Sequence, residues 1–324
     1  MYPLDPASLT VGARFPVSDS RWTGRPLDDP VVAAIGNTPL VPLPSIVRAA
    51  GGGFELWAKA EHLNPTGSVK DRAARGIVVD AISAGLLGPG RTLLDASSGN
   101  TAVAYAMLGA RLGFPVELVL PANAHASRVA RIQGFGARIA FTEAAEGTDG
   151  SQREARRRAA ADPDRYFYPD QYNNPSNPGA HYSSTGPEIW TQAAGRVTHF
   201  VAGVGTGGTI SGVSRFLKER NPAVRVVGVE PPGPYHGIEG LKHLPTALRP
   251  STYDPRLIDE TLRVETEDAL AMQERLALEE GLSVGSSAGA AVWAAVEVGR
   301  SASGSVVVTI LPDGGHGFTG GGPP

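Results

Sequence analysis

Residues 92–120 read TLLDASSGNTAVAYAMLGARLGFPVELVL and describe a strand, a helix and a second strand. The apolar segments 92–96 and 116–120 have the length of buried strands, and residues 100–112 have the pattern of a helix. Parallel strands joined by helices are covered on both faces, which makes them apolar along their whole length. The stretch therefore predicts an α/β fold built on a parallel sheet.

The same alternation continues on both sides of this stretch. Further strands are predicted at residues 54–60, 138–141, 199–202, 224–229 and 305–311, and further helices at 68–84, 126–135, 209–220, 267–280 and 288–298. Residues 168–182, rich in Pro, Asn and Gly, predict a loop at a domain junction, and residues 231–255 a long irregular insertion. We predict an N-terminal arm and a segment packing on the larger domain (1–53), a smaller domain (54–165) and a larger domain (166–324), both domains being three-layer α/β/α with mostly parallel sheets.

Composition excludes several classes of function. The 324 residues are 41% hydrophobic and carry a net charge of −3, and the arginines at 153–158 alternate with acidic residues, so no nucleic-acid partner is expected. There is no cysteine, which excludes disulfides, thiolate metal sites and a cysteine nucleophile, and we predict no metal site. The N-terminus has no secretory pattern and the chain has no apolar stretch of about 18 residues, so a cytoplasmic protein without a membrane partner is predicted.

Two Ser-rich turns stand where open α/β sheets bind ligands, at strand ends and helix starts. The first is SSGNT at residues 97–101, which offers hydroxyls, an amide and backbone N–H groups at a helix N-terminus. It is either a site for an anion or carboxylate or a capped helix start. The second is GSSAG at residues 285–289, which by itself favours a helix cap.

A glycine-rich turn, GVGTGGT at residues 203–209, has the composition of a phosphate cradle before a helix. It contains G-x-G-x-x-G at Gly203, Gly205 and Gly208. Glu230 ends the next predicted strand, near the place where a dinucleotide fold has its ribose-binding acid. A nicotinamide dinucleotide site is therefore a real alternative to a site for another phosphorylated cofactor.

Lys70 lies in NPTGSVKDR at residues 64–72. Pro65 and Gly67 predict a turn and Ser68 an N-cap, so Lys70 falls in the first helical turn, where a cation opposes the helix dipole. The positive helix end favours a neutral amine, which suits a Schiff base. The alternative is an exposed surface lysine.

Taken together and in this order, NPTGSVKDR, SSGNT, GVGTGGT and SSAG resemble the cysteine synthase and cystathionine β-synthase family, closest to its bacterial cysteine synthases. IGNTPL at 35–40, the NP pairs within 174–178 and TGPE at 185–188 extend the resemblance over about residues 33–313. The resemblance implies a pyridoxal-phosphate (PLP) enzyme of fold type II, like tryptophan synthase β. It also implies a homodimer and a mobile smaller domain that carries the PLP lysine.

The resemblance implies a role for each motif. Lys70 would carry PLP and act as the base at the substrate α-carbon. Asn100 would bind the cofactor 3′-oxygen, and Ser287 would face the pyridine nitrogen. The phosphate would be held by Gly205, Thr206, Gly207, Gly208 and Thr209. The substrate α-carboxylate would be bound by Ser98, Thr101 and Gln171, with Ser97 beside them.

The implied reaction is β-replacement on an O-activated L-serine, either O-acetylserine or O-phosphoserine, with sulfide to give L-cysteine through an aminoacrylate. A serine hydroxyl does not keep the pyridine nitrogen protonated, so the ring is a weaker electron sink and loss of the β-substituent is favoured over transamination. Closure of the smaller domain would exclude water from the intermediate.

One segment departs from the family pattern, and another is expected to decide the substrate. DGGHGF at 313–318 lacks the usual tyrosine, and His316 stands near the usual glutamate; a tolerated variant is preferred to a role in tuning the cofactor. YHGIEGLKH at 235–243 is expected to line the mouth of the site. Lys242 lies near an arginine of a phosphoserine-using relative, so we hypothesise that it contacts an anionic leaving group or co-substrate; a solvated lysine is the alternative.

Other functions remain as alternatives. The acceptor is a sulfide, a thiol such as homocysteine, or an amine, which includes cystathionine β-synthase and other β-substituted alanine synthases. Serine and threonine dehydratases usually carry S-F-K at the lysine and fit less well. A nicotinamide-dependent oxidoreductase would leave Lys70 and the SSGNT turn unexplained. A catalytically silent homologue is disfavoured because every motif residue is intact.

Overall fold

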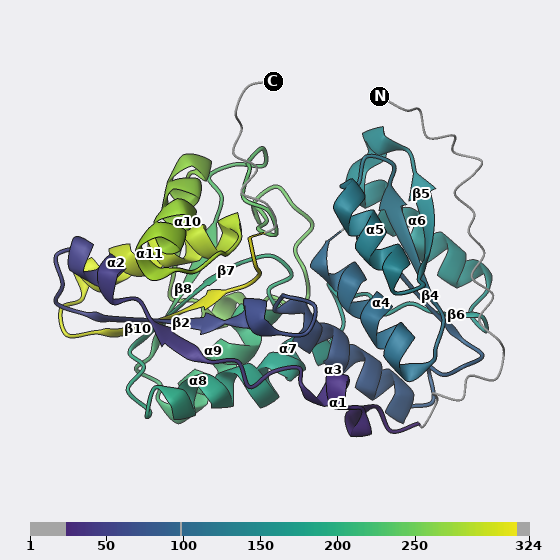
Figure 1. Ribbon diagram of the computed structural model, residues 1–324, viewed down its shortest axis with the longest axis horizontal. Coiled ribbons are helices and arrows are strands. Elements are labelled where there is room, and N and C mark those ends of the chain that lie inside the picture. The colour runs from purple at the N-terminus through teal and green to yellow at the C-terminus, as the bar shows by residue number, and fades with distance from the viewer. Residues whose placement is uncertain (1–23, 98, 316–324) are drawn as a thin grey trace. The chain divides into compact units, whose positions relative to one another are not determined.

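The computed structural model describes residues 24–97 and 99–315. The chain divides into two compact units (Figure 1). The larger unit contains residues 33–77 and everything described from residue 170 onward, and the smaller unit contains residues 78–169 with the described part of the segment before residue 33. Helix α3 (Lys70–Ser83) begins in the larger unit and ends in the smaller one.

The larger unit is built on a six-stranded sheet. Its strands, in spatial order, are β1 (Leu40–Pro42), β2 (Glu55–Ala60), β10 (Val306–Leu311), β7 (His199–Gly203), β8 (Arg225–Glu230) and β9 (Glu260–Arg263). β1 runs antiparallel to β2, and all the other neighbours are parallel. The central strands are apolar along their length because helices cover both faces.

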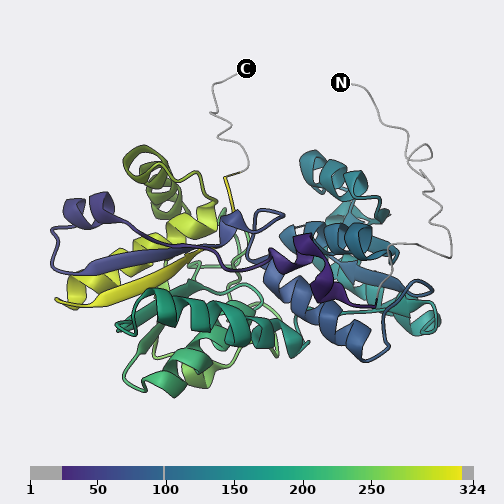
Figure 2. The same cartoon turned by 60° about the horizontal axis from the view of Figure 1, so that its bottom comes forward.

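Helices lie on both faces of this sheet (Figures 1 and 2). One face is covered by α2 (Pro44–Ala49), α10 (Thr266–Glu280) and α11 (Ser286–Ser301), and the other by α8 (Gly186–Gln192) and α9 (Gly208–Arg220). Neighbouring residues of one strand point to opposite faces, so Val307 packs in the core beneath α11 and Val308 in the core beneath α9. Both cores are buried, which holds the carboxyl ends of β7 and β8 in place.

The smaller unit has a parallel four-stranded sheet in the order β5 (Arg138–Thr142), β4 (Val116–Pro121), β3 (Thr92–Ala96) and β6 (Tyr166–Phe167). The helices that connect these strands are α4 (Asn100–Leu112), α5 (Ala126–Gly134) and α6 (Gly147–Ala161), and α1 (Pro30–Ala33) and α3 also reach into this unit. The chain moves from β3 through β4 to β5 and then returns across the sheet to β6. Right-handed crossovers therefore place α4 and α5 on one face and α6 on the other. Leu94 and Val119 accordingly share a core with Ala155 of α6.

The predicted domain boundaries differ from this division. Residues 54–77, which include Lys70, belong to the larger unit because β2 is hydrogen-bonded between β1 and β10 in the six-stranded sheet. Residues 166–169 belong to the smaller unit because β6 pairs with β3. Of the predicted arm 1–53, residues 24–32 go with the smaller unit and residues 33–53 with the larger one. The sequence could not predict this assignment of residues 54–77 and 166–169, because β2 and β6 pair with strands that are far away in the chain.

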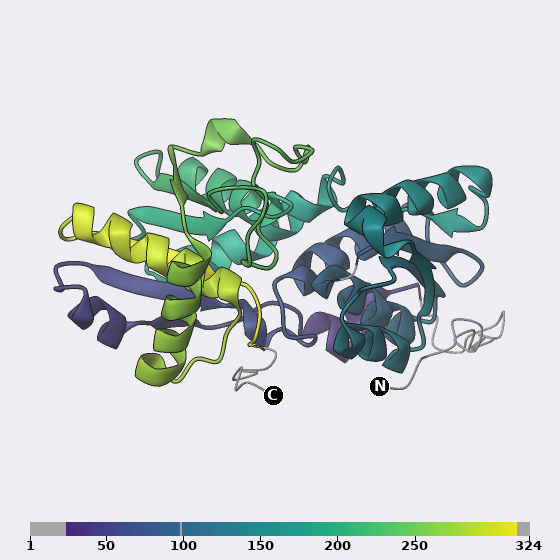
Figure 3. The same ribbon diagram turned by 90° about the horizontal axis from the view of Figure 1, so that it is seen from above.

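Two predicted loops have different outcomes. Residues 168–182 contain α7 (Ser176–Ala180), which is followed by a π-helix (His181–Thr185), so the prediction of a loop was wrong there. Residues 231–254 contain no helix or strand, as predicted, and Figure 3 shows them as green loops. Within the described part of the chain, no helix combines the length and apolarity that crossing a membrane requires.

Candidate active site

Lys70 is the first residue of α3, and the turn before it is fixed by backbone hydrogen bonds. The Gly67 N–H donates to the Asn64 carbonyl at 2.7 Å, and the Val69 N–H donates to the Pro312 carbonyl at 2.7 Å. The Thr66 N–H and hydroxyl both donate to the Asp71 carboxylate, which lies in the first turn of the helix, where an acid is favoured. The NPTGS turn thereby sets where Lys70 begins its helix.

The Lys70 side chain is partly buried, which removes the alternative of a fully exposed surface lysine. Burial lowers the pKa of Lys70, and the carboxylate of Asp313 opposes that shift. Asp313 is brought beside the lysine because Ser68 and Asp313 form an antiparallel bridge. A lysine with a lowered pKa has a larger share of neutral, nucleophilic amine at a given pH.

A buried network of four charged side chains anchors the first turn of α3. Arg72 is fully buried; its guanidinium donates to Glu61 Oε2 at 2.7 Å and to Glu188 Oε1 at 2.7 Å. Lys59 reaches the other oxygen of Glu188 at 2.6 Å. Burial alone would raise the pKa of Glu188, but the hydrogen bonds and charges of Arg72 and Lys59 hold it at about 2. The network ties α3 to β2 and α8.

The glycine-rich turn lies between the end of β7 and the start of α9, as the phosphate cradle requires. Gly207 has a φ of +82°, and a Cβ there would lie 2.5 Å from the Cβ of Tyr253. A Cβ at Gly205 would run into the carbonyl oxygen of Gly240. Glycine is needed at both positions, because one demands a left-handed backbone and the other a close approach of the chain. Helix starts of this kind bind anions; here the Gly208 N–H donates to the Thr206 hydroxyl at 3.4 Å.

His181 connects the glycine-rich turn to the π-helix. Its Nε2 lies 3.2 Å from the Thr209 hydroxyl and its Nδ1 lies 2.9 Å from the Thr185 hydroxyl. Burial and the charges of Arg72 and Lys70 lower the pKa of His181 to about 3, so the ring is neutral near pH 7. A neutral ring has one donor and one acceptor nitrogen, and both are used here. His181 was not predicted from sequence, because a lone histidine in a Pro-rich stretch carries no signal of this contact.

Gln171 lies on the other side of the same turn. Its side chain is buried, and its backbone carbonyl accepts a hydrogen bond from Asn177 Nδ2 at 2.8 Å. The same Asn177 nitrogen lies 3.2 Å from the Thr206 hydroxyl. A Cβ at Gly208 would collide with the Asn177 side chain. The predicted substrate residue Gln171 and the predicted phosphate turn are therefore connected through one amide.

Ser287 stands in the first turn of α11, where the SSAG motif was predicted to open a helix. It is buried, and its hydroxyl lies 3.4 Å from Asp313 Oδ1. The Gly285 N–H donates to the Asp313 carbonyl at 3.1 Å. Asp313 thus interacts with both Lys70 and Ser287. The sequence had pointed to the turn at 313–318 only as a departure from a family pattern, and His316 lies outside the described residues.

The SSGNT turn lies in the smaller unit, at the end of β3 and the start of α4, as predicted. The Ser97 hydroxyl accepts the Gly99 N–H at 3.3 Å, Asn100 is the first helical residue and Thr101 is buried. No capping bond comes from the residue before the helix, because that residue is glycine. The described residues of the turn stand at a helix N-terminus, where an anion site is predicted. Ser98 lies outside the described residues.

Lys242 belongs to the irregular segment 231–254. Its N–H donates to the Val204 carbonyl at 2.9 Å, which attaches this segment to the glycine-rich turn. Its ammonium lies 4.5 Å from the ring centroid of Tyr172, the residue after Gln171. Lys242 is half-buried, and both interpretations, a contact with an anionic group and a solvated lysine, stay predictions.

The larger unit therefore contains most of the predicted site. Asn177 connects Gln171 to the turn 205–209, and Asp313 lies beside both Lys70 and Ser287. Lys242 is attached to the glycine-rich turn through the Val204 carbonyl. Ser97, Asn100 and Thr101 form a second cluster in the smaller unit. Among the residues that the structure describes, no three His, Asp or Glu side chains gather as metal ligands would. The arrangement offers a nucleophilic amine and two anion-binding helix starts.

Known proteins resemble the chain over most of its length. A profile of the pyridoxal-phosphate dependent enzymes matches residues 31–313. The cysteine synthase of Aquifex aeolicus is 47% identical, over 88% of this chain and 89% of that protein. A cysteine synthase (OASS) from Entamoeba histolytica has a TM-score of 0.84 and 32% identity, covering 88% of this chain and 87% of its own. An O-acetylserine dependent cystathionine β-synthase from Helicobacter pylori has a TM-score of 0.83 and 33% identity, covering 90% and 97%.

These matches bear on the predictions. They confirm the predicted fold, α/β with two mostly parallel sheets, and its assignment to fold type II. They also confirm PLP as the cofactor and a cysteine synthase-like enzyme. The nicotinamide alternative, which rested on the glycine-rich turn alone, is not supported by any of them.

Proposed function

The chain belongs to the pyridoxal-phosphate dependent enzymes and is cysteine synthase-like; from this premise we propose that it forms L-cysteine from an O-activated L-serine and sulfide. The donor is O-acetylserine or O-phosphoserine. The observation that carries the proposal is Lys70, a lysine of lowered pKa at the start of α3, held beside Asp313 by the bridge between Ser68 and Asp313.

The residues of the larger unit fit PLP. The turn 205–209 is a cradle in which glycines admit an anion close to the start of α9, and Lys70 is the amine that would bind the cofactor. Ser287 would face the pyridine nitrogen, and Asn100 of the smaller unit would bind the 3′-oxygen. When bound, PLP supplies an electron sink for the bond changes at the substrate α- and β-carbons.

Lys70 has a second task in the proposed reaction. Its neutral amine would take the proton from the substrate α-carbon and later return it. The lowered pKa of Lys70 suits a base, because the amine is neutral for a larger fraction of the time. Asp313 opposes part of that shift and keeps the ammonium form accessible for the return of the proton.

The substrate carboxylate is assigned to both units. We propose that Ser98, Thr101 and Gln171 bind it, with Ser97 beside them. The start of α4 and the buried Thr101 hydroxyl support this assignment, because backbone N–H groups at a helix start bind a carboxylate well. We further propose that the smaller unit is the mobile one and excludes water when the substrate is bound.

The relatives support sulfide as the acceptor and also favour a second candidate. The Aquifex aeolicus relative is a cysteine synthase, and the Helicobacter pylori relative is an O-acetylserine dependent cystathionine β-synthase. The second candidate function is therefore cystathionine formation, with homocysteine as the acceptor. The third candidate acceptor for the same β-replacement reaction is an amine. The homodimer and the cytoplasmic location stay predictions.

A matrix of donors and acceptors tests the proposal. The enzyme loaded with PLP is mixed with O-acetylserine, O-phosphoserine or L-serine, and each donor is combined with sulfide, homocysteine or an amine. We expect the highest kcat/KM for sulfide with one of the two activated donors, measured as L-cysteine formed. Higher kcat/KM with homocysteine would replace the proposal by the second candidate.

Two variants accompany the matrix. Lys70→Ala should bind no cofactor covalently and form no product, whereas Lys218→Ala, a lysine paired with Asp259 on the surface of the same unit, should behave like the wild type. Lys242→Ala should raise KM for O-phosphoserine more than KM for O-acetylserine if its ammonium meets an anionic leaving group. An equal change in the two KM values would remove Lys242 from the substrate site.

A further inference from the structure

A cavity of about 660 Å³ lies beside β8 and β9 of the larger unit, beyond the residues assigned to the cofactor. It is lined by Glu230, Leu244, Pro245, Arg249, Tyr253, Thr261 and Arg263. Its floor is formed by the carboxyl ends of two parallel strands, the edge at which α/β sheets bind ligands. The volume is in the range of small-molecule sites.

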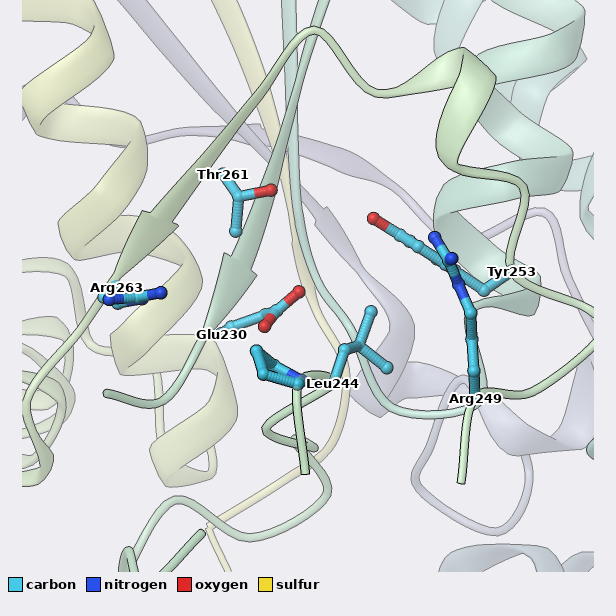
Figure 4. A pocket seen from close by; sticks show the side chains of 7 residues that line it. Glu230, Leu244, Arg249, Tyr253, Thr261 and Arg263 are labelled. Atoms are coloured by element: carbon cyan, nitrogen blue, oxygen red, sulfur yellow. The ribbon is translucent and has the colours of Figure 1, made fainter. Parts of the chain in front are cut away.

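The cavity is charged. Glu230 is 6% exposed and Arg263 is its partner in the register of the parallel strands β8 and β9, so both side chains lie on one face of the sheet. Figure 4 shows the Glu230 carboxylate in the middle of the lining, with Arg263 to one side and Arg249 to the other. Arg249 and Arg263 are exposed, and neither forms an ion pair within residues 24–97 and 99–315. The three groups sum to one positive charge.

The protein uses only part of the hydrogen-bonding capacity of the Glu230 carboxylate. The Leu244 N–H faces it closely enough to lower its pKa. Burial raises the pKa of Glu230, while that N–H and the charges of His243, Arg263 and Arg249 lower it. A carboxylate has room for several donors, so oxygen sites facing the cavity are left for a ligand. Thr261 and Tyr253 add hydroxyl groups to the same lining.

A wall separates this cavity from the cofactor cradle. Thr252 donates its hydroxyl hydrogen to the Thr206 carbonyl at 2.6 Å, and the Asp254 N–H donates to the Ser211 hydroxyl at 2.9 Å. Between them, Tyr253 turns its Cβ toward Gly207 and its ring toward the cavity. Residues 252–254 therefore have the cradle on one side and the cavity on the other. A ligand in the cavity would not occupy the place of the cofactor phosphate.

We propose that this cavity is a binding site for an amino acid that carries a second acidic group. Its ammonium group pairs with Glu230, and its two acidic groups pair with Arg249 and Arg263. Such a ligand carries one net negative charge against the single positive charge of the three side chains. Charge-assisted hydrogen bonds of this kind are about twice as strong as neutral ones and give the site its selectivity. The site is separate from the reaction proposed above and does not depend on its donor or acceptor.

Calorimetric titration tests the proposal on the PLP-loaded enzyme at low ionic strength. L-Glutamate is compared with glutarate, which lacks the ammonium group, and with L-norvaline, which lacks the second carboxylate. We expect L-glutamate to bind about tenfold tighter than either analogue, which is the effect of one lost charged contact of about 1.4 kcal/mol. The visible absorption of the bound cofactor should stay unchanged, because the ligand lies behind the wall.

Variants locate the binding. Arg263→Gln and Arg249→Gln should each weaken L-glutamate binding by about tenfold. Arg275→Gln, on α10, removes an arginine outside the cavity lining and should leave the affinity unchanged. The proposal is overturned if L-glutamate does not bind, if the three compounds bind equally, or if both cavity variants keep the wild-type affinity. A change of the cofactor absorption that saturates with L-glutamate would place the ligand at the cofactor and would also overturn it.

Discussion

Lys70 and Asp313 form the pair of residues on which the proposed chemistry depends most directly. Burial of Lys70 lowers its pKa, and the Asp313 carboxylate favours the charged ammonium form. The two are joined by the backbone bridge between Ser68 and Asp313, so the spacing of charge and amine is set by the main chain. The pKa of Lys70 is thus set by two opposing effects, burial and the charge of Asp313.

Asp313→Asn tests this balance. The substitution removes a negative charge that raises the pKa of Lys70, so that pKa should fall further. Capture of PLP requires the neutral amine, and the pH at which the apoenzyme captures PLP at half its maximal rate should therefore be lower in the variant. The rate is followed by absorbance across a pH series.

Asp259→Asn is the matched control, because Asp259 pairs with Lys218 on the surface and not with Lys70. Its half-maximal pH should equal that of the wild type. An unchanged or higher half-maximal pH in Asp313→Asn would show that Asp313 does not set the pKa of the lysine.

At the scale of elements, α3 is held at its first turn by the buried network of Arg72, Glu61, Glu188 and Lys59. These side chains come from α3, the 3-10 helix after β2, α8 and β2 itself. A buried ion pair adds little net stability compared with apolar packing, but removal of one partner leaves a charge without compensation. The network therefore fixes where these elements meet.

Arg72→Met should lower the free energy of unfolding by about 3–5 kcal/mol, because Glu61 and Glu188 lose their main partner. Urea denaturation measures the change. Arg215→Met removes an exposed arginine from α9 and should cost no more than about 0.5 kcal/mol. Similar losses in the two variants would mean that the buried network contributes no more than a surface pair.

The same network makes the free energy of unfolding depend on pH through the titration of Glu188. The folded-state pKa of Glu188, about 2, lies below its usual value, so its contribution is complete at neutral pH and is lost as the pH falls toward 2. In Arg72→Met that pKa rises toward its unfolded value, so the loss of stability between neutral pH and pH 2, measured by urea denaturation, should be smaller than in the wild type.

For the whole molecule, the predicted roles are divided between the two units. The larger unit contains Lys70 and the phosphate cradle, and the smaller unit contains the helix start of α4 with Thr101. The chain passes between the units after residues 32, 77 and 169. The proposed division assigns the holding of the cofactor mainly to one unit and the recognition of the substrate carboxylate to the other.

Two isosteric substitutions test this division. Thr209→Val, in the larger unit, should raise Kd for PLP several-fold because one hydroxyl of the cradle is lost. Thr101→Val, in the smaller unit, should raise KM for the donor by about tenfold, the cost of one hydrogen bond to a charged group, with Kd for PLP unchanged. Equilibrium titration with PLP and steady-state kinetics measure the two effects. A loss of PLP affinity in Thr101→Val alone would reverse the assignment.

The sequence by itself determined the local elements and the family, and it carries the motifs from which the candidate site is proposed. Residues 92–96 and 100–112 coincide with β3 and α4, because the hydrophobic period and the SSGNT turn are local signals. Lys70 and the turn 205–209 were predicted as site residues from their motifs at helix starts, and Ser287 only through the family resemblance. The family was visible in the same motifs.

The tertiary structure decided what depends on distant contacts. Lys70 belongs to the larger unit because β2 pairs with β10, about 250 residues away in the chain. Residues 176–185 are helical, although they are rich in Pro, Asn and Gly, because they pack on α9, where Gly212 leaves room for Pro178 and His181. The contacts of Asp313 and His181, and the cavity at Glu230, depend on residues that are far away in the sequence. No local pattern encodes these contacts, since packing and charge act through space and not along the chain.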